Sequence, residues 1–526
     1  MARLPLARFG LGLGGRLTRF TALALLVGCA TSPRVEPRPI APPMVPPPFA
    51  YETFDAVWTT IDEKHFDPTH NGVDWIAVRD ELRPKVADVR TNDELRALLN
   101  EMIGRLGQSH FGIIPKEIAS PSGARAAVSA AHVTEPTHSP AAAMPIASRT
   151  PVESSTALST HELAAPIDGK SSDAAMAGDP GVWFRLVDGS IVTVAPRPGG
   201  PAERAGIRAG WALAEVNGVA VVAPTRPAPA TGDTAASDST MVRYLAQNIA
   251  AHPAHFAPDR AVTLTFDTPQ GRRTVEMVAG RFAGESVKFG NLPPLDTVVV
   301  ERVITPSERD LAEISGEAGT FGSIAFNIWM IPAAPLLDTA VDRRRTDEGI
   351  VLDLRGNPGG VGAMAMGIGG HFLSEPLSLG RMVSPQGTIE FRVNPRRVTS
   401  DGRVVMPYSG PLAILVDPLT ASTSEIFAAG MQELGRARVF GQTSAGAALP
   451  SIAVALPNDD VLQYAMADFI TPAGNRIEGH GVVPDSPVEL TRDSLSRDPD
   501  PVLTAALRWL ADEALRRKVT APAPTS

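Results

Sequence analysis

The chain has 526 residues, more than one hydrophobic core usually accommodates, so we expect several domains. A content of 44% hydrophobic and 20% charged residues is typical of a globular protein, and the net charge of −9 argues against a nucleic-acid partner. No apolar run reaches the length of a membrane-spanning helix, and no metal-binding or nucleotide-binding motif occurs, so we expect neither a metal nor another cofactor.

Residues 1–28 have the form of an export signal, with arginines followed by the apolar run 20–27. The run ends in Leu-Val-Gly-Cys at Cys29, which is the only cysteine of the chain. This ending resembles a bacterial lipobox, where the cysteine carries lipid; the alternative is a leader with a chance cysteine. Since Ala30 follows instead of an aspartate, the resemblance implies anchoring at the periplasmic face of the bacterial outer membrane.

Residues 29–48 are rich in proline and predict a semi-rigid tether. Residues 49–116 have helical periodicity, and a capping box formed by Thr91 and Glu94 predicts the start of a third helix. We interpret this segment as a small N-terminal helical domain. Residues 117–178, rich in Ala, Ser, Pro and Thr, are predicted to be a disordered insertion.

Residues 179–282 predict a β-rich domain with a short helix beginning at Pro201 and a late hairpin around Gly271. The stretch Ile191–Gly218 resembles a PDZ domain, interrupted by a polar insertion at 223–239. PDZ domains bind an extended peptide by strand addition. The resemblance implies a loop that binds the peptide carboxylate at Gly181, Val182 and Trp183, although the last two are equally compatible with ordinary strand core.

In residues 283–515, short apolar strands alternate with helices, and 516–526 are predicted to be a disordered tail. The strand Leu412–Val416 runs into Thr-Ala-Ser-Thr-Ser-Glu, which places Ser422 at the start of a helix. There the helix dipole and unpaired N–H groups stabilise an oxyanion. The alternative is that Ser422 only caps the helix, with Glu425 completing a capping box.

Two further motifs favour the nucleophile. Asp-Leu-Arg-Gly-Asn-Pro-Gly-Gly begins at Asp353, and Glu-Gly-His-Gly-Val-Val-Pro-Asp begins at Glu478. Together with the serine motif, in this order, they resemble the C-terminal-processing, or tail-specific, serine peptidase family and its tricorn-like relatives. The resemblance implies a multidomain α/β protein: a helical domain, a PDZ domain and a ββα catalytic core like those of crotonase and ClpP.

A serine hydroxyl needs a base to remove its proton. The lysine used by the best-known branch of this family is absent, because Ala447 stands 25 residues beyond Ser422. The tricorn-like branch uses a Ser-His pair and a glutamate instead. That resemblance implies His110 as the base, with Ser109 and Glu478 orienting it. Two alternatives remain: His110 as a histidine that merely ends a helix, and His480 as a rival base.

For the oxyanion hole, the backbone N–H of Thr423 is the expected first donor. The second is that of Gly359 or Gly360, since glycine allows a close backbone approach. Asp353 and Arg355 are expected to brace the strand and turn.

The sequence therefore predicts a lipid-anchored serine endopeptidase of periplasmic proteins or peptides, whose PDZ domain binds peptide termini. The alternative is a non-catalytic scaffold of the same fold that binds peptides or apolar ligands. The oligomeric state is left open by the sequence.

Lipid attachment gives a first prediction. Radiolabelled palmitate should be incorporated by the full-length protein and not by Cys29→Ala, because no other cysteine is present. Equal labelling of both proteins would contradict the lipoprotein interpretation.

Overall fold

The computed structural model describes residues 47–116, 178–221, 261–281, 285–287, 295–304 and 319–520, apart from 195, 198 and 499. The predicted signal peptide, Cys29, the polar insertion 223–239 and nearly all of the proline-rich tether lie outside the described residues. So does the predicted disordered insertion 117–178, except for its last residue, Gly178, which begins strand β2. In the described part, no helix has the length and apolar character needed to cross a bilayer.

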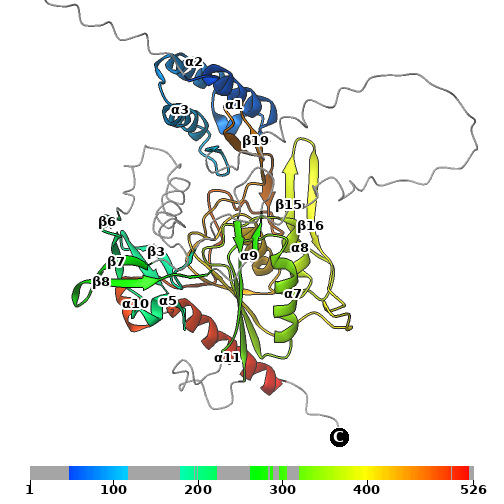
Figure 1. Ribbon diagram of the computed structural model, residues 1–526. Helices are drawn as coiled ribbons and strands as arrows, with labels where there is room; N and C mark the ends of the chain where they lie inside the picture. The colour runs from blue at the N-terminus through cyan, green and yellow to red at the C-terminus, as the bar shows by residue number, and fades with distance from the viewer. Residues whose placement is uncertain are drawn as a thin grey trace, which may run out of the picture. The chain divides into compact units, whose positions relative to one another are not determined.

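The N-terminal region folds into helices, as its periodicity predicts (Figure 1). Thr91 caps the third long helix by accepting a hydrogen bond from the N–H of Glu94, so the predicted capping box marks a true helix start. The elements are α1 (Ala50–Lys64), η1 (His70–Gly72), α2 (Trp75–Leu82), η2 (Arg83–Asp88), α3 (Asn92–Gly104) and the short strand β1 (Gly112–Ile114).

The second region is an antiparallel sheet with strand order β3-β4-β5-β7-β8, in which β3 lies at an edge. The predicted short helix and the late hairpin are both confirmed. The elements are β2 (Gly178–Asp179), β3 (Trp183–Val187), β4 (Ser190–Val194), α5 (Pro201–Arg204), β5 (Ala212–Val216), β6 (Val219–Ala220), β7 (Ala261–Thr268), β8 (Gly271–Val278) and β9 (Gly280–Arg281).

The third region is a mixed α/β core. Its sheet has the order β12-β13-β14-β17-β18-β22, with one antiparallel pair and four parallel pairs. Its elements are β10 (Glu285–Val287), β11 (Leu295–Thr297), β12 (Val299–Ile304), β13 (Phe321–Phe326), α7 (Ala333–Arg344), β14 (Gly349–Asp353), α8 (Ala363–Gly369), β15 (Leu377–Ser384), β16 (Gly387–Val393), β17 (Leu412–Val416), α9 (Thr423–Glu433), β18 (Arg438–Gly441), β19 (Ser451–Ala455), β20 (Val461–Ala465), β21 (Asp468–Ile470), β22 (Ser486–Pro487), α10 (Arg492–Arg497) and α11 (Pro501–Thr520).

Helices cover both faces of this sheet. In β14, Ile350 and Leu352 pack in a cluster with residues of α7, α8 and α9, whereas Val351 packs with α11. Because side chains alternate along a strand, a strand covered on both faces is apolar on both, as Ile350–Leu352 of β14 and all of β17 are. The neighbouring parallel strands β14 and β17 end at the same edge, so the glycine turn and the Ser422 turn meet there.

One prediction about the C-terminus is wrong. Residues 516–520 were expected in a disordered tail, but α11 continues to Thr520. The side chain of Lys518 forms an ion pair with Glu348, which fixes this last turn of the helix against the core. Residues 521–526 lie outside the described residues.

A buried ion pair links the antiparallel sheet to the core at the Ser422 turn. Arg185 on β3 donates from Nε to Asp417, the residue that follows β17. The other oxygen of Asp417 accepts from the N–H groups of Gly356 (2.8 Å), Leu419 (3.0 Å) and Thr420 (3.1 Å). Burial would raise the pKa of Asp417, but Arg185 and the backbone donors outweigh it and hold that pKa below its usual value.

We therefore expect Asp417→Ala to destabilise the protein by about 3–5 kcal/mol, because the Arg185 charge would stay buried without its partner. Chemical denaturation measures this loss. The control is Asp493→Ala, which removes a carboxylate from the exposed i,i+4 pair with Arg497 and should cost at most about 1 kcal/mol. Equal losses in the two variants would contradict the structural role of Asp417.

Candidate active site

Ser422 occupies a strained turn at the head of α9. It is the N-cap residue, with φ 55° and ψ −121°, a conformation that non-glycine residues rarely adopt. Its N–H donates to the carbonyl oxygen of Ala447 (2.8 Å) and to Oε2 of Glu425 (3.0 Å). The capping relation with Glu425 is thus present, and the strained backbone exceeds what a helix cap alone requires.

The Gly359–Gly360 turn lies directly against this serine. A Cβ on Gly359 would come within 2.6 Å of Cβ of Ser422 and within 2.9 Å of the nitrogen of Thr423. A Cβ on Gly360 would lie 2.3 Å from the carbonyl oxygen of Trp329. Both glycines have positive φ, so neither the backbone nor the space admits a side chain.

The hydrogen bonds of this turn distinguish the two glycines. The N–H of Gly359 donates to Oδ1 of buried Asn357 (3.0 Å) and is therefore occupied. The carbonyl oxygen of Gly360 accepts from Oγ1 of Thr423 (2.9 Å). Within the described residues, the N–H groups of Gly360 and Thr423 have no hydrogen-bond acceptor. Those two donors are the ones available to a ligand.

Glu425, which the sequence presented only as part of a capping box, is a fully buried carboxylate with four donors. Besides Ser422, it accepts from Oγ of Ser444 (2.6 Å) and from the N–H groups of Gly446 (2.7 Å) and Ala447 (3.0 Å). Burial raises the pKa of Glu425 to about 7, against the opposing effect of these donors. Glu425 thereby fastens the 444–447 loop to the serine turn.

His110 lies in the loop between α3 and β1, also with positive φ (62°). Its Nδ1 is 2.8 Å from Oγ of Ser109, and that hydroxyl donates to Oε2 of Glu478 (2.8 Å). The N–H of Ser109 donates to Oε1 of the same carboxylate (2.7 Å). Because the serine proton is given to Glu478, the serine oxygen accepts from Nδ1–H, which leaves Nε2 of His110 unprotonated.

The 447–448 backbone joins the two halves of the site. Ala447 accepts from the N–H of Ser422, and the next residue, Ala448, donates its N–H to Oε2 of Glu478 (3.0 Å). Ser422, His110, Ser109 and Glu478 therefore lie in one connected network. In the described residues, no hydrogen bond joins the hydroxyl of Ser422 to His110. A catalytic hydrogen bond of this kind often shortens only when substrate binds.

The environment of His110 changes the pH dependence expected of an ordinary imidazole. Burial lowers the pKa of His110 to about 4, because the cation would be desolvated. Burial also raises the pKa of Glu478, although three hydrogen bonds oppose the shift. An unperturbed imidazole would be protonated below pH 6–7, so His110 retains its free Nε2 to lower pH.

The rival base, His480, does not join this network. It is exposed, and its Nδ1 lies 3.0 Å from the carbonyl oxygen of Glu478, not from its carboxylate. It lines a pocket beside the end of α9 together with Gln432.

The predicted role of Asp353 and Arg355 as a brace is confirmed. Arg355 donates to both Asp353 and Asp500, and so ties β14 to the start of α11.

The predicted carboxylate loop of the antiparallel sheet has mixed features. The N–H of Gly181 is taken by Asp179 (2.8 Å), and the side chain of Val182 is part of the local core. Trp183 is 45% exposed at the start of edge strand β3, with the guanidinium of Arg185 5.6 Å from its ring centre. The core alternative thus holds for Val182 and not for Trp183.

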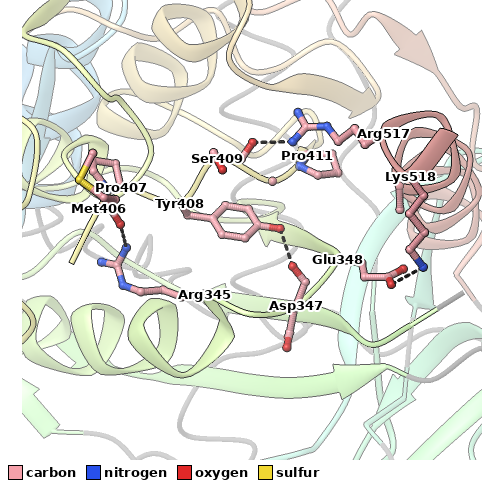
Figure 2. Close-up of a pocket in the computed structure, with 12 residues that line it drawn as sticks. Arg345, Asp347, Glu348, Met406, Pro407, Tyr408, Ser409, Pro411, Arg517 and Lys518 are labelled. Carbon is pink, nitrogen blue, oxygen red and sulfur yellow. Dashed lines mark hydrogen bonds and ion pairs between the residues drawn. The ribbon is translucent and has the colours of Figure 1, made fainter. Parts of the chain in front are cut away.

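A pocket of about 440 Å³ lies elsewhere, between the 406–411 loop and the end of α11 (Figure 2). Figure 2 shows its polar groups paired with one another: Tyr408 donates to the carbonyl oxygen of Asp347, and Arg517 to that of Ser409. It contains none of the predicted site residues. The polar groups of this pocket are therefore already engaged with one another, and the pocket is separate from the Ser422 turn.

Comparison with known proteins identifies two domains. Residues 330–488 match the model of Peptidase family S41, and residues 51–104 match the tricorn protease C1 domain. The first contains Ser422, Glu478 and the glycine turn, and the second ends just before Ser109. The chain thus contains a region similar to the S41 peptidase domain, preceded by a region similar to the tricorn C1 domain.

Individual proteins similar to this chain include C-terminal-processing proteases. The chain is 29% identical, over 228 residues, to the carboxyl-terminal-processing protease of Picosynechococcus sp., covering 41% of this chain and 52% of that protein. It is 25% identical to the chloroplastic C-terminal processing peptidase of Tetradesmus obliquus, covering 62% of this chain and 61% of that one. The chain spans about half the length of the curated relatives it matches. The crystal structure of mature CPAF shares the fold (TM-score 0.51, 13% identity, 90% of this chain and 98% of that one).

Glu425 gives a pH-dependent stability prediction. Its folded pKa of about 7 lies above the ordinary value of 4.5, so between these pH values the folded protein holds a proton that the unfolded chain has released. Stability should therefore fall as pH rises from 4.5 to 7, by roughly 3 kcal/mol relative to Glu425→Gln. Unfolding free energies of both proteins across this range measure it. Parallel curves would contradict the assignment.

Proposed function

We propose that this protein is a serine-type endopeptidase in which Ser422 is the nucleophile and His110 the general base. The observation that carries the proposal is the connected network of Ser422, His110, Ser109 and Glu478, built across an S41 domain and a tricorn-type helical domain. A protein that only bound peptides would not need an imidazole with a free Nε2, oriented by a buried glutamate.

In the proposed reaction, Nε2 of His110 removes the proton of Ser422 as its Oγ attacks the scissile carbonyl carbon. The N–H groups of Thr423 and Gly360 donate to the oxyanion, with the helix dipole of α9 adding to the stabilisation. His110 then protonates the leaving amine, and a water molecule, activated by the same imidazole, hydrolyses the acyl-enzyme. Ser109 and Glu478 hold the imidazole in the tautomer that this sequence of steps requires.

We further propose that the antiparallel sheet acts as a PDZ domain that selects peptide termini. Two features support this role: β3 pairs only with β4 among the described strands, so it has one unpaired edge, and Trp183 at its start is half-exposed. An extended peptide could add to this edge by backbone hydrogen bonds. Because Arg185 of β3 reaches Asp417, peptide bound here would lie on the strand that contacts the Ser422 turn.

The proposed substrates are periplasmic proteins or peptides, reached from a lipid anchor at Cys29 on the outer membrane. The support for this location is the export-signal pattern and the single cysteine. The proposal defines the substrate by one chemical feature, an accessible peptide terminus.

The proposed mechanism predicts which histidine is needed. His110→Ala should lower kcat by about a thousandfold or more, since the nucleophile loses its base. His480→Ala is the matched control and should keep nearly full activity. In the wild type, kcat/KM plotted against pH should decrease on the acidic side only as pH drops through about 4, where His110 becomes protonated.

Labelling with a fluorophosphonate probe distinguishes the peptidase from a non-catalytic scaffold. The wild type should be labelled and Ser422→Ala should not, while its stability changes by no more than about 1–2 kcal/mol for a lost helix cap. An active Ser422→Ala, or a dead His480→Ala beside an active His110→Ala, would overturn the mechanism.

A further inference from the structure

The segment that carries His110 is held at both ends by one residue of the S41 domain. Asp460, in the turn between β19 and β20, is fully buried. Its carboxylate accepts two hydrogen bonds from Arg96 on α3 (2.9 Å from Nε and 2.7 Å from Nη2) and one from the N–H of Lys116 (2.9 Å). Arg96 precedes His110 in the chain and Lys116 follows it, so Asp460 closes a loop around the histidine.

Strand pairing continues this attachment toward His110. Strand β1 starts two residues after the histidine and pairs antiparallel with β20, with Gly112 opposite Gln463 and Ile114 opposite Val461. Leu456 and Leu462 of the β19–β20 hairpin are part of the same apolar cluster as the helices α1–α3. Figure 1 shows β19 beside these helices. The hairpin is therefore the surface on which the helical domain docks.

The Asp460 carboxylate is itself fixed in place. Asn458 donates to its Oδ2 from Nδ2 (2.8 Å), and the N–H of Asp460 donates back to Oδ1 of Asn458 (3.2 Å). Burial would raise the pKa of Asp460, but the hydrogen bonds from Arg96, the N–H of Lys116 and Asn458 outweigh it and lower that pKa. A bidentate contact between an ionised carboxylate and a guanidinium fixes the relative orientation of the two groups as well as their distance.

We propose that Asp460 is a positioning residue for the reaction, acting through Arg96 and the Lys116 backbone to hold His110 against the Ser422 turn. This inference rests on the proposed function, because it concerns the placement of the proposed base. The base comes from one domain and the nucleophile from another, and Glu478 holds the Ser109–His110 pair through hydrogen bonds to Ser109. The Asp460 contact, together with the β1–β20 pairing, fixes the rest of the segment and so limits how far the helical domain can turn about Glu478.

The test is Asp460→Asn, which keeps the size of the side chain and removes its charge and one acceptor. We expect kcat to fall at least tenfold with KM within about twofold of wild type. The second readout is the NMR titration of His110, assigned by its absence in His110→Gln. Its pKa should rise from about 4 toward 6.5 as the loop becomes solvated.

The matched control is Asp55→Asn. Asp55 accepts a similar bidentate pair of hydrogen bonds from Arg83 (2.7 and 2.8 Å) within the helical domain, away from the hairpin. This variant should leave kcat and the His110 titration unchanged. If Asp460→Asn fails to fold, Arg96→Lys decides: it keeps the charge, loses the second hydrogen bond, and should shift both readouts in the same direction by a smaller amount.

The positioning role is refuted if the His110 titration of Asp460→Asn, or of Arg96→Lys where Asp460→Asn does not fold, stays at wild-type values. It is also refuted if Asp55→Asn shifts kcat and the titration by the same amount. The titration also separates this inference from the proposed function. A wild type without peptidase activity whose His110 still responds to Asp460→Asn would refute the function and support the positioning contact. An active peptidase whose His110 does not respond would do the reverse.

Discussion

The candidate active site depends on the hydrogen bonds that the buried carboxylate of Glu478 accepts. It receives two hydrogen bonds from Ser109 and one from Ala448, and so joins segments that lie 369 residues apart in the chain. Without it, both the N–H and the hydroxyl of Ser109 would lose their acceptor, and Ser109 is the residue that contacts Nδ1 of His110. A carboxylate suits this task because it accepts several hydrogen bonds at once and has none to donate when ionised.

The same burial that fixes these groups shifts their titration. The pKa values of Glu425 and Glu478 are raised and that of His110 is lowered, in each case because the charged form is desolvated. For His110 the effect favours the neutral imidazole, the form that the proposed role as general base requires. For Glu425 it places a buried proton near neutral pH next to Ser422, the proposed nucleophile, at a cost in stability that the four donors only partly offset.

Local patterns predicted most of the strands and the Ser422 turn, because their periodicities and caps are set by neighbouring residues. The strand β17 and the helix that follows it are where the apolar run and the capping box indicate. The C-terminal helix extends beyond its predicted end because of a distant contact of Lys518, which no local pattern contains.

The residues of the candidate site were predictable from the sequence only where they belong to a recognised motif. The sequence left Gly359 and Gly360 equivalent, and the choice depends on the amide of Asn357 occupying one of the two N–H groups. Glu425 was visible as a capping residue, but its contacts with the 444–447 loop depend on the fold. Asp460 carried no signal at all, since its partner Arg96 lies 364 residues away.

The central claim is that His110 of the helical domain and Ser422 of the region similar to the S41 peptidases act on one peptide bond. A crystal structure of the protein reacted with a peptide boronic acid tests this most directly. The account predicts boron bonded to Oγ of Ser422 and one boronate oxygen about 3 Å from the N–H groups of Thr423 and Gly360. It also predicts that Nε2 of His110 faces the adduct. Boron on another residue, or an adduct on Ser422 that His110 does not contact, would contradict it.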